Sequence, residues 1–259
     1  MAKAQISRMT PQTLQGKRIV ILGGSAGIGL GVARRAVAEG AHVVIASHDR
    51  GRVDRAVAAV RDGAAAGTNA GTIAGHAVDL RAAAETRALL DAVGPIDHLV
   101  FTAGEELLLS PLAELDLAAA RRFFELRYWG ALAAIQAARP HLARDGSIVL
   151  TSGAASRRPH PGFVIGASIC AAMEAATRAL AIELAPIRVN IVTPGFVETD
   201  LWSNIPADAR AQMFRDAAAK LPVGRVGTPD DIAEHYLGFM RGRYVTGQAL
   251  VVDGGGVLV

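Results

Sequence analysis

The chain has 259 residues, of which 51% are hydrophobic and 20% charged, and its formal net charge is +3. This length and hydrophobic content are sufficient for a large α/β domain with a sizeable core, and the small, scattered charge excess argues against a nucleic-acid partner. A single cysteine, Cys170, excludes a disulfide within the chain. Residues 1–17 lack the apolar segment of a signal peptide, and uncharged stretches such as 163–173 are too short to span a bilayer. We therefore expect a cytoplasmic protein without a membrane segment.

Strand-like and helix-like segments alternate from Lys17 onward. Short β-branched runs predict strands, and apolar residues at helical spacing predict the helices between them. In chain order, strands are expected at 17–23, 41–47, 73–78, 97–104, 146–152, 187–193 and 248–255. Helices are expected at 27–39, 52–61, 81–92, 116–143 and 165–185, and one more begins at Thr228 and Pro229. Residues 63–72 are read as a loop of small residues, and 195–220 show no strong period.

This alternation is typical of a parallel sheet that is covered by helices on both faces. The predicted fold class is α/β: a single-domain, Rossmann-like, doubly wound parallel sheet of about seven strands. We place an N-terminal arm at residues 1–15 and the domain itself at 16–259, with no internal repeat.

A glycine-rich turn, ILGGSAGIGLG, joins the first predicted strand to the first predicted helix, with spaced glycines at Gly23, Gly27 and Gly29. Without a Cβ, backbone N–H groups can approach a ligand closely, and positive φ values carry little steric cost. The helix that follows presents unpaired N–H groups and a partial positive charge. A tight turn without a ligand is the alternative, but the strand–turn–helix context favours a bound diphosphate.

Further motifs follow in order: TAG at 102–104, GSIVLTS at 146–152, IRVNIVTPG at 187–195 and VTGQALVVDGGG at 245–256. Together with the glycine loop they resemble the short-chain dehydrogenase/reductase family, over nearly the whole chain from about residue 16. The resemblance implies one doubly wound domain that binds NAD or NADP and acts as an oxidoreductase on a small molecule.

The end of the second strand usually distinguishes the two nucleotides, because a carboxylate there repels a 2′-phosphate. This chain has Ser47 and His48 at that point, followed by Arg50 and Arg52, although Asp49 also lies there. Hydroxyls and cations suit a phosphate, so we favour NADP over NAD. The cofactor-binding residues are then Ser25 in the glycine loop and, by resemblance, Ile28, Asp79, Leu80, Ala103, Gly104, Pro194, Gly195, Val197 and Thr199. No metal site is expected.

The resemblance also implies a catalytic asparagine, serine, tyrosine and lysine. The tyrosine donates a proton, and the lysine four residues later lowers the tyrosine pKa and holds the ribose. Ser152 matches the serine, and Arg127 falls at the asparagine position. Thirteen residues after Ser152, Ile165 occupies the tyrosine position, and Ile169 that of the lysine. Since hydrocarbon side chains cannot donate protons, the chain is identified as an atypical member that lacks this Tyr–Lys pair. A shifted register of this alignment is the alternative, although the flanking glycine and small residues of the motif argue against it.

Three functions stay open at this stage. We favour an NADP(H)-dependent oxidoreductase that acts on a small, apolar carbonyl, alcohol or activated substrate, with protons supplied by a group other than the family tyrosine. Nearby groups in the family geometry are Ser152, Arg127, Tyr128, Glu105 and His160; of these, Arg127 would stabilise an oxyanion rather than donate a proton. The alternatives are a nucleotide sensor without turnover and a scaffold subunit.

Two expectations concern assembly and access. The predicted helices at 116–143 and 165–185 carry small and apolar residues over much of their surface, and the resemblance implies that they pair into a dimer or tetramer. Residues 195–220 follow the segment expected to contact the cofactor carboxamide, so we expect them to form a substrate lid. Trp202 and Phe214 in this segment favour an apolar substrate.

Overall fold

A seven-stranded, fully parallel sheet forms the centre of the molecule, in the order β3-β2-β1-β4-β5-β6-β7. The computed structural model describes residues 13–64, 71–105 and 107–259. The strands are β1 (Arg18–Leu22), β2 (His42–Ser47), β3 (Thr72–Ala77), β4 (Ile96–Phe101), β5 (Leu142–Thr151), β6 (Arg188–Pro194) and β7 (Ala249–Val252). The strand order reverses between β1 and β4, which makes the predicted single-domain, doubly wound fold correct.

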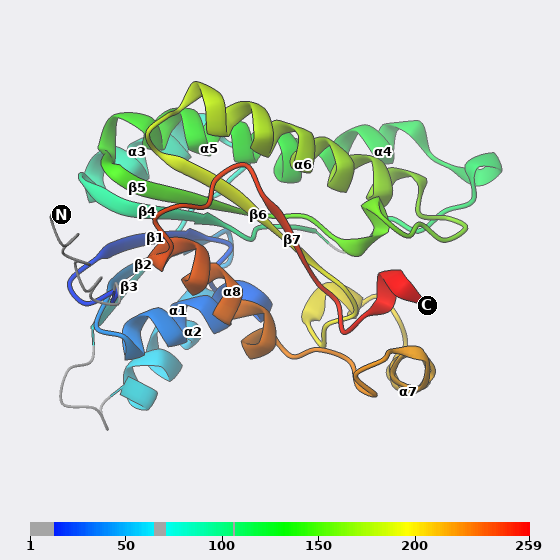
Figure 1. Ribbon diagram of the computed structural model, residues 1–259. Coiled ribbons are helices and arrows are strands. Elements are labelled where there is room, and N and C mark those ends of the chain that lie inside the picture. Colours follow the sequence, from blue (N-terminus) through cyan, green and yellow to red (C-terminus); the bar gives the residue numbers. More distant parts are fainter. Residues whose placement is uncertain (1–12, 65–70, 106) are drawn as a thin grey trace, which may run out of the picture.

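Helices cover both faces of the sheet (Figure 1). On one face lie α3 (Ala83–Val93), α4 (Leu117–Phe124), α5 (Ala131–Ala138) and α6 (Val164–Glu183). On the other face lie α1 (Gly27–Ala38), α2 (Arg50–Ala64) and α8 (Pro229–Arg241). A further helix, α7 (Ala207–Lys220), stands apart from both layers, on the same side of the molecule as the C-terminus.

The central strands β1, β4 and β6 are largely buried on both faces, whereas the edge strands β3 and β7 keep exposed positions. The alternation of side chains on the central strands divides the core in two. Ile19 and Ile21 of β1 belong to the cluster shared with α1, α2 and α8, whereas Val20 and Leu22 belong to the cluster shared with α3, α5 and α6. A strand that must fill two cores is apolar at every position, which is why these strands read as continuous β-branched runs. Leu14 is also buried in the first cluster, so the end of the predicted N-terminal arm packs with the domain.

Two predicted segments differ from the structure. The helix expected at 116–143 is divided into α4, a π-helical segment (Glu125–Gly130) and α5, followed by a short 3₁₀ turn (Arg139–His141), and β5 already begins at Leu142. Residues 195–220, which show no period in sequence, contain α7 and a short 3₁₀ helix, η5 (Asp200–Trp202). The loop expected at 63–72 lies partly outside the described residues.

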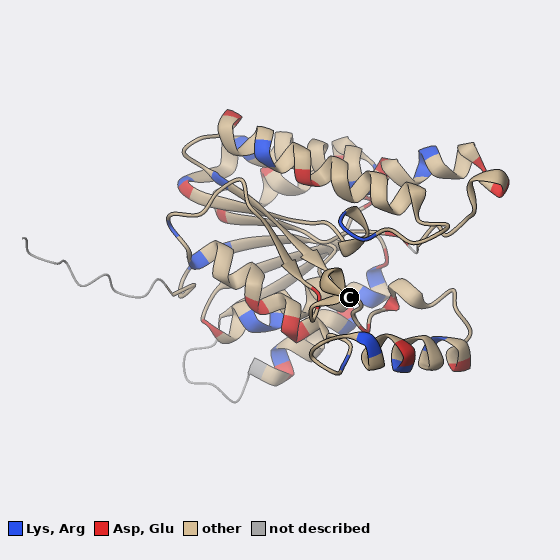
Figure 2. Cartoon of the chain, turned by 45° about the vertical axis from the view of Figure 1, so that its right-hand side comes forward, with Lys and Arg blue, Asp and Glu red and all other residues tan. Residues whose placement is uncertain are grey.

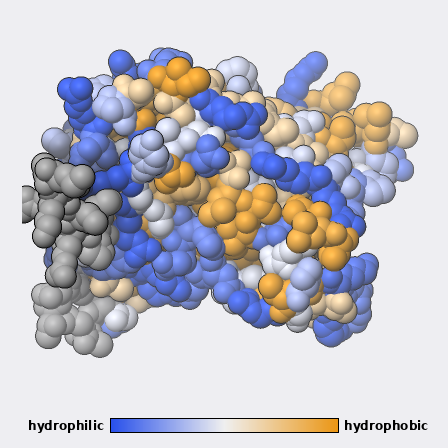
Figure 3. Space-filling model, viewed as in Figure 1, coloured by the Kyte–Doolittle hydropathy of each residue, from blue (hydrophilic) through white to orange (hydrophobic). Residues whose placement is uncertain are grey.

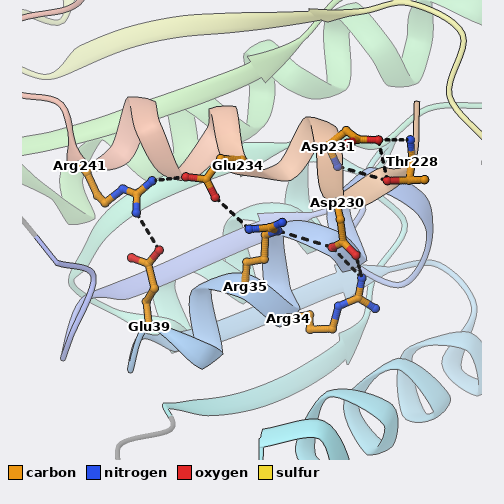
Figure 4. Close-up of polar contacts among 8 residues, drawn as sticks. All are labelled: Arg34, Arg35, Glu39, Thr228, Asp230, Asp231, Glu234 and Arg241. Carbon is orange, nitrogen blue, oxygen red and sulfur yellow. Dashed lines mark hydrogen bonds and ion pairs between the residues drawn. The ribbon is translucent and has the colours of Figure 1, made fainter. Parts of the chain in front are cut away.

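Salt bridges join α1 to α8, two helices far apart in the sequence that pack side by side (Figure 4). Between the two helices, Arg34 pairs with Asp230 at 2.7 Å, Arg35 with Glu234 at 2.9 Å, and Arg241 with Glu39, the C-cap of α1, at 2.9 Å. Within α8, Arg241 also pairs with Glu234 at 2.6 Å. Thr228 and Asp231 form a reciprocal capping box at the start of α8. Hydrogen bonds from the Arg225 side chain and the Thr228 backbone hold the pKa of Asp231 far below its usual range. This corner fixes α8 behind the glycine loop.

The outer surface mixes both charges with apolar patches. Figure 2 shows basic and acidic residues scattered over both helical layers, with long tan stretches on the upper helices. Helix α6, at 20 residues, is long and apolar enough to cross a membrane by length and composition, but it packs along β6 in the helical layer. Only 28% of its apolar window is buried, and Ile182 is 82% exposed. Figure 3 shows a second apolar area over β7 and the C-terminal residues, where Leu250 and Leu258 are exposed.

Candidate functional site

A crevice of about 790 Å³ opens at the carboxyl ends of the parallel strands. Its wall takes residues at or just after each of the seven strands, in sequence order Gly23, Ser47, Asp79, Thr102, Ser152, Gly195 and Asp253. Ligands of doubly wound sheets bind at this edge, where the strand order reverses. The crevice brings together segments from residue 23 to residue 257, so the fold places the spaced sequence motifs in one site.

The glycine loop forms one side of the crevice, and its positions 23 and 29 have no room for a Cβ. Gly23 has a φ of 94°, and a Cβ there would lie under 3.0 Å from the backbone of Ala103. A Cβ on Gly29 would clash with the Gly23 carbonyl and with Thr102 Oγ1. These two glycines are therefore required by the contact between the loop and the end of β4, and they leave the loop backbone free to face the crevice.

The start of α1 has the character of an anion site. Ala26 occupies its N-cap position without a side-chain cap, and within the described residues its first turn holds no acidic side chain. The first N–H groups of a helix lack partners in the helix and carry a partial positive charge. Because Gly27 and Ile28 also line the crevice, this helix end can accept the phosphates of a nucleotide.

Ser47, His48 and Arg52 line the crevice beyond β2. Asp49, the carboxylate that weakened the sequence argument for NADP, accepts a hydrogen bond of 2.8 Å from the Arg52 backbone N–H. That bond lowers the pKa of Asp49 and ties the carboxylate to the start of α2. Within the described lining, this end of the crevice therefore presents hydroxyl, imidazole and guanidinium groups but no carboxylate of β2 or of its turn.

Arg50, which we expected at the cofactor, is not among the described residues of the crevice wall. Its side chain is exposed and lies 3.9 Å from Asp54, one turn further along α2. The cation that faces the crevice is Arg52, two residues later. The helical rotation of α2 explains the correction, because residues two apart project about 200° from one another.

A chain of polar groups crosses from the end of β3 to the end of β4. The backbone N–H of Arg81 donates to Asp79 Oδ1 at 3.0 Å, and the Arg81 guanidinium donates to Glu105 Oε1 at 2.6 Å. All three residues line the crevice. Glu105 Oε2 is buried and has no hydrogen-bond partner among the described residues. Sequence reasoning named Glu105 only as a nearby group and did not place Arg81 in the site.

Arg127 brings a positive charge to the crevice wall. The π-helical segment positions it so that its guanidinium lies against Gly104, where a Cβ would be 2.6 Å from Arg127 Cζ. The guanidinium donates to the Glu105 carbonyl at 2.6 Å, while Nε is buried without a partner among the described residues. Burial lowers the pKa of Arg127, and the nearby Glu105 opposes that shift. An arginine in this position stays charged and can stabilise negative charge.

Tyr128, the next residue, is not part of the described crevice wall. Its ring packs edge-on against Trp129, with the centroids 5.0 Å apart, and tilted against Phe124. Tyr128 is thus a packing aromatic in the structure, and a catalytic role for it beside Arg127 stays a prediction without geometric support. His160 does line the crevice, together with Phe163.

Ser152 lines the crevice, but its hydroxyl is held from behind by Glu174, which sequence reasoning missed. Ser152 Oγ lies 3.1 Å from Glu174 Oε1 and 3.2 Å from the Cys170 carbonyl, and the serine is 9% exposed. Glu174 is buried and also accepts hydrogen bonds from Ser156 at 2.6 Å and from Arg157 at 3.1 Å. Glu174 thereby orients the Ser152 hydroxyl, and Ser152 can still accept a hydrogen bond from a ligand.

The side of α6 that lies next to the crevice is not the one with the two isoleucines. None of Ile165, Gly166, Ile169 and Cys170 is in the described wall. Ile169 is 2% exposed, whereas Cys170 lies directly behind Gly153. A Cβ on Gly153, which does line the crevice, would lie 3.2 Å from Cys170 Sγ. Gly166 is one helical turn before Cys170, on the same side of the helix, and a Cβ there would meet nothing within 4 Å.

In the family, the tyrosine follows the serine by thirteen residues and the lysine follows the tyrosine by four. If these spacings are counted from Gly153 instead of Ser152, they lead to Gly166 and Cys170, on the side of α6 that faces Gly153. A tyrosine and a lysine are absent on either count, and the second count puts an open space and a thiol beside the crevice. Burial raises the pKa of Cys170, and the charge of Arg127 opposes that rise.

The remaining predicted cofactor residues come together as expected. Every predicted cofactor position except Arg50 lies in the crevice wall: Gly23, Ser25, Gly27, Ile28, Gly29, Ser47, His48, Asp79, Leu80, Ala103, Gly104, Pro194, Gly195, Val197 and Thr199. Trp202 and Leu201 from the predicted lid also line it. Their roles in binding are a prediction that the geometry makes reasonable.

Comparisons with known proteins agree with this geometry. Residues 23–256 match a family described as enoyl-(acyl carrier protein) reductase. The short-chain dehydrogenase/reductase ATR9 of Stachybotrys chlorohalonatus is 37% identical, covering 95% of this chain and 99% of that protein. A crystal structure described as a small-chain dehydrogenase in complex with NADPH is 32% identical, with a TM-score of 0.81 and coverage of 95% and 100% of the two chains. The MalC reductase/Diels-Alderase of Malbranchea aurantiaca is 28% identical, with a TM-score of 0.87 and coverage of 95% and 98%. The chain therefore belongs to the short-chain dehydrogenase/reductase family of oxidoreductases.

Proposed function

We propose that this protein is an NADP(H)-dependent oxidoreductase whose substrate is a small, mainly apolar molecule with an activated acceptor, such as an alkene conjugated to a carbonyl group. The observation that carries the proposal is the position of Arg127, a cation held against Gly104 in the crevice wall, in a site without the tyrosine and lysine of the family. The match to a family described as enoyl-(acyl carrier protein) reductase supports an activated alkene as one such acceptor.

The preference for NADP rests on the charges beyond β2. Ser47, His48 and Arg52 face the crevice, and Asp49 is tied to the start of α2. A 2′-phosphate would meet donors and a guanidinium there, whereas the ribose hydroxyls of NAD would lack the usual carboxylate. The glycine loop and the uncapped start of α1 suit the diphosphate of either nucleotide. The related structure in complex with NADPH supports the same choice.

The bound cofactor would supply a hydride, and residues of this chain would stabilise the negative charge that the hydride leaves on the substrate. Hydride addition to a conjugated alkene places negative charge on the carbonyl oxygen of the substrate, and Arg127 can stabilise that charge. Such an acceptor needs no proton from the protein in the same step. A simple ketone needs a proton on its oxygen as the hydride is added, and this chain lacks the tyrosine that donates it in the family. Trp202 and Phe163 give the adjoining wall an apolar character that suits the substrate.

A nucleotide-binding sensor or scaffold is the second candidate. The observation that favours it is the small size of Gly153, Gly166 and Cys170, which leaves this side of the crevice without a family proton donor. A sensor would bind NADPH and alter its affinity for a protein partner without turnover. The reductase is preferred because Arg127 and Ser152 still present polar groups to the crevice.

Purified protein should be titrated calorimetrically with NADPH and NADH, and its NADPH consumption measured with matched panels of ketones and conjugated enones. We expect tighter binding of NADPH and turnover confined to the enones. Arg127→Met should lower kcat/KM by about 100-fold, whereas Arg121→Met, on the exposed side of α4, should not. Binding without turnover on either panel would favour the sensor, and an active Arg127→Met variant would refute the role of Arg127.

We also propose that the protein assembles through α6 and through the edge strand β7. Only 28% of the apolar window of α6 is buried within the chain, Ile182 on this helix is 82% exposed, and Figure 3 shows apolar residues over β7 and the C-terminus. Edge strands and apolar patches of this kind are usually covered in a soluble protein. A dimer or tetramer in the cytoplasm is the arrangement that these two surfaces support.

A further inference from the structure

An ion pair joins two walls of the crevice. Arg52 lies in the first turn of α2, and Asp200 opens η5, 148 residues later. An Arg52 guanidinium nitrogen contacts Asp200 Oδ2, and both residues line the crevice. The pair therefore connects the corner after β2, where the 2′-phosphate of NADP would lie, with the segment after β6 that was predicted to form the substrate lid.

The segment around Asp200 is close to the glycine loop. Thr199, the residue before it, caps η5 by accepting a hydrogen bond from the Leu201 N–H at 3.3 Å. A Cβ on Gly27 would lie 3.3 Å from Thr199 Cγ2, so this segment packs directly on the loop that faces the phosphates. A change at Asp200 is thus a change at the edge of the nucleotide site.

Asp200 is also connected to α7 through an aromatic cluster. Trp202, two residues later, is 6% exposed, donates from Nε1 to the Val197 carbonyl at 3.0 Å, and stacks on Phe196 with the centroids 5.3 Å apart. Trp202 meets Phe214 of α7 edge-on at 6.2 Å. A displacement of η5 must therefore alter the environment of Trp202 and the packing of α7.

We propose that Asp200 is a specificity-determining residue, because its carboxylate competes with a nucleotide 2′-phosphate for Arg52. A phosphate carries up to two charges and three acceptor oxygens, and arginine binds it bidentately, so it is the stronger partner. NADP(H) would take Arg52 from Asp200 and release η5 and α7, whereas NAD(H) would leave the ion pair in place. The inference rests on the proposed binding of NADP(H), and it adds a coupling between the 2′-phosphate and the substrate segment.

Two small nucleotides isolate this coupling. Adenosine 2′,5′-bisphosphate carries the 2′-phosphate without the nicotinamide, and ADP lacks the 2′-phosphate. Trp202 is one of two tryptophans in the chain, so a Trp129→Phe background leaves it as the sole tryptophan. We expect saturating adenosine 2′,5′-bisphosphate to change the Trp202 emission and to speed tryptic cleavage at Arg215, within α7. ADP at saturation should do neither.

Variants of Arg52 and Asp200 should distinguish the role of the cation from that of the carboxylate. Arg52→Met should weaken binding of adenosine 2′,5′-bisphosphate by about tenfold or more and leave ADP binding unchanged. Asp200→Asn should tighten binding of adenosine 2′,5′-bisphosphate severalfold, and its Trp202 emission and tryptic cleavage should no longer respond to the ligand. Asp208→Asn, an exposed carboxylate on α7, serves as the matched control and should behave as the parent protein.

The outcomes distinguish the inference from the proposed function. Equal Trp202 and cleavage responses to ADP and to adenosine 2′,5′-bisphosphate would overturn the coupling while nucleotide binding stands. An Asp200→Asn variant that responds like its parent would do the same. Failure of the parent protein to bind NADPH or either small nucleotide would remove the proposed function as well.

Discussion

Acidification should destabilise this protein through His98, a buried histidine on β4. Its Nδ1 lies 2.8 Å from Ser147 Oγ on β5, and the residue is 4% exposed. Burial lowers the pKa of His98 from 6.5 to about 4, with Asp97 opposing that shift. The folded protein therefore keeps this imidazole neutral at a pH where an unfolded chain would already have protonated it.

The sign and size of the effect follow from proton linkage. Because the folded pKa is the lower one, the contribution of His98 to the free energy of unfolding is complete above pH 6.5 and is lost progressively as the pH falls from 6.5 to about 4. The difference between the two pKa values corresponds to about 3 kcal/mol at full protonation, of which about 2.5 kcal/mol is already lost by pH 4.5. Protonation would leave a charged imidazole in the core between two strands.

Urea unfolding at pH 7.5 and pH 4.5 measures the contribution of His98 to the free energy of unfolding. His98→Gln keeps a group that can hydrogen-bond Ser147 but removes the titration, so the stability difference between parent and variant should shrink by about 2.5 kcal/mol at the lower pH. His42→Gln, an exposed histidine on β2, is the matched control. A parent–variant difference that stays constant within about 0.5 kcal/mol between the two pH values would refute the reasoning.

Three further predictions concern the nucleotide site and the assembly. Gly23→Ala should lower Tm and abolish calorimetric binding of NADPH, because the residue has a φ of 94° and its Cβ would clash with Ala103; Gly63→Ala, with open space around it, should change stability by less than about 1 kcal/mol. Alkylation of Cys170 by N-ethylmaleimide, followed by mass spectrometry, should slow by about tenfold or more with saturating NADPH, since bound ligand would block access past Gly153. Adenosine 2′,5′-bisphosphate, which lacks the nicotinamide, should give no protection. Equal alkylation rates with and without NADPH would place Cys170 away from the nicotinamide. Ile182→Glu should convert the oligomer to monomers in light scattering, because this side chain is 82% exposed in the single chain; an unchanged mass would show that this part of α6 is not an interface.

The central strands were predictable because their side chains enter a core on both faces of the sheet. Runs such as the one around Ile19 and Val20 are continuous in β-branched residues, and the structure places neighbours in opposite cores. The helix boundary near residue 143 was wrong because the alanine-rich pattern ends at Ala138 and Pro140 cannot continue an α-helix, so that β5 already begins at Leu142. Helix α7 was missed because it has no fully buried residue and so no clear apolar stripe.

The candidate site was predictable as far as the backbone motifs reach. Spaced glycines mark a close approach of the chain to itself or to a ligand, and Gly23 and Gly29 are in such contacts. The side chains that project from helices were harder to place. An error of one residue on α6 turns the assigned position by about 100°, which is the difference between Ile169 in the core and Cys170 beside the crevice.

The sequence by itself determined the α/β class, the order of the strands along the chain and the tight glycine turn at Gly23, because these depend on local patterns of burial and backbone freedom. Only the tertiary structure decided which side chains share the crevice. Arg52 meets Asp200, and Glu174 holds Ser152, through contacts between segments that are distant along the chain or on different elements. Such contacts are fixed by how helices rotate and pack on the sheet, and no pattern within either segment alone specifies them.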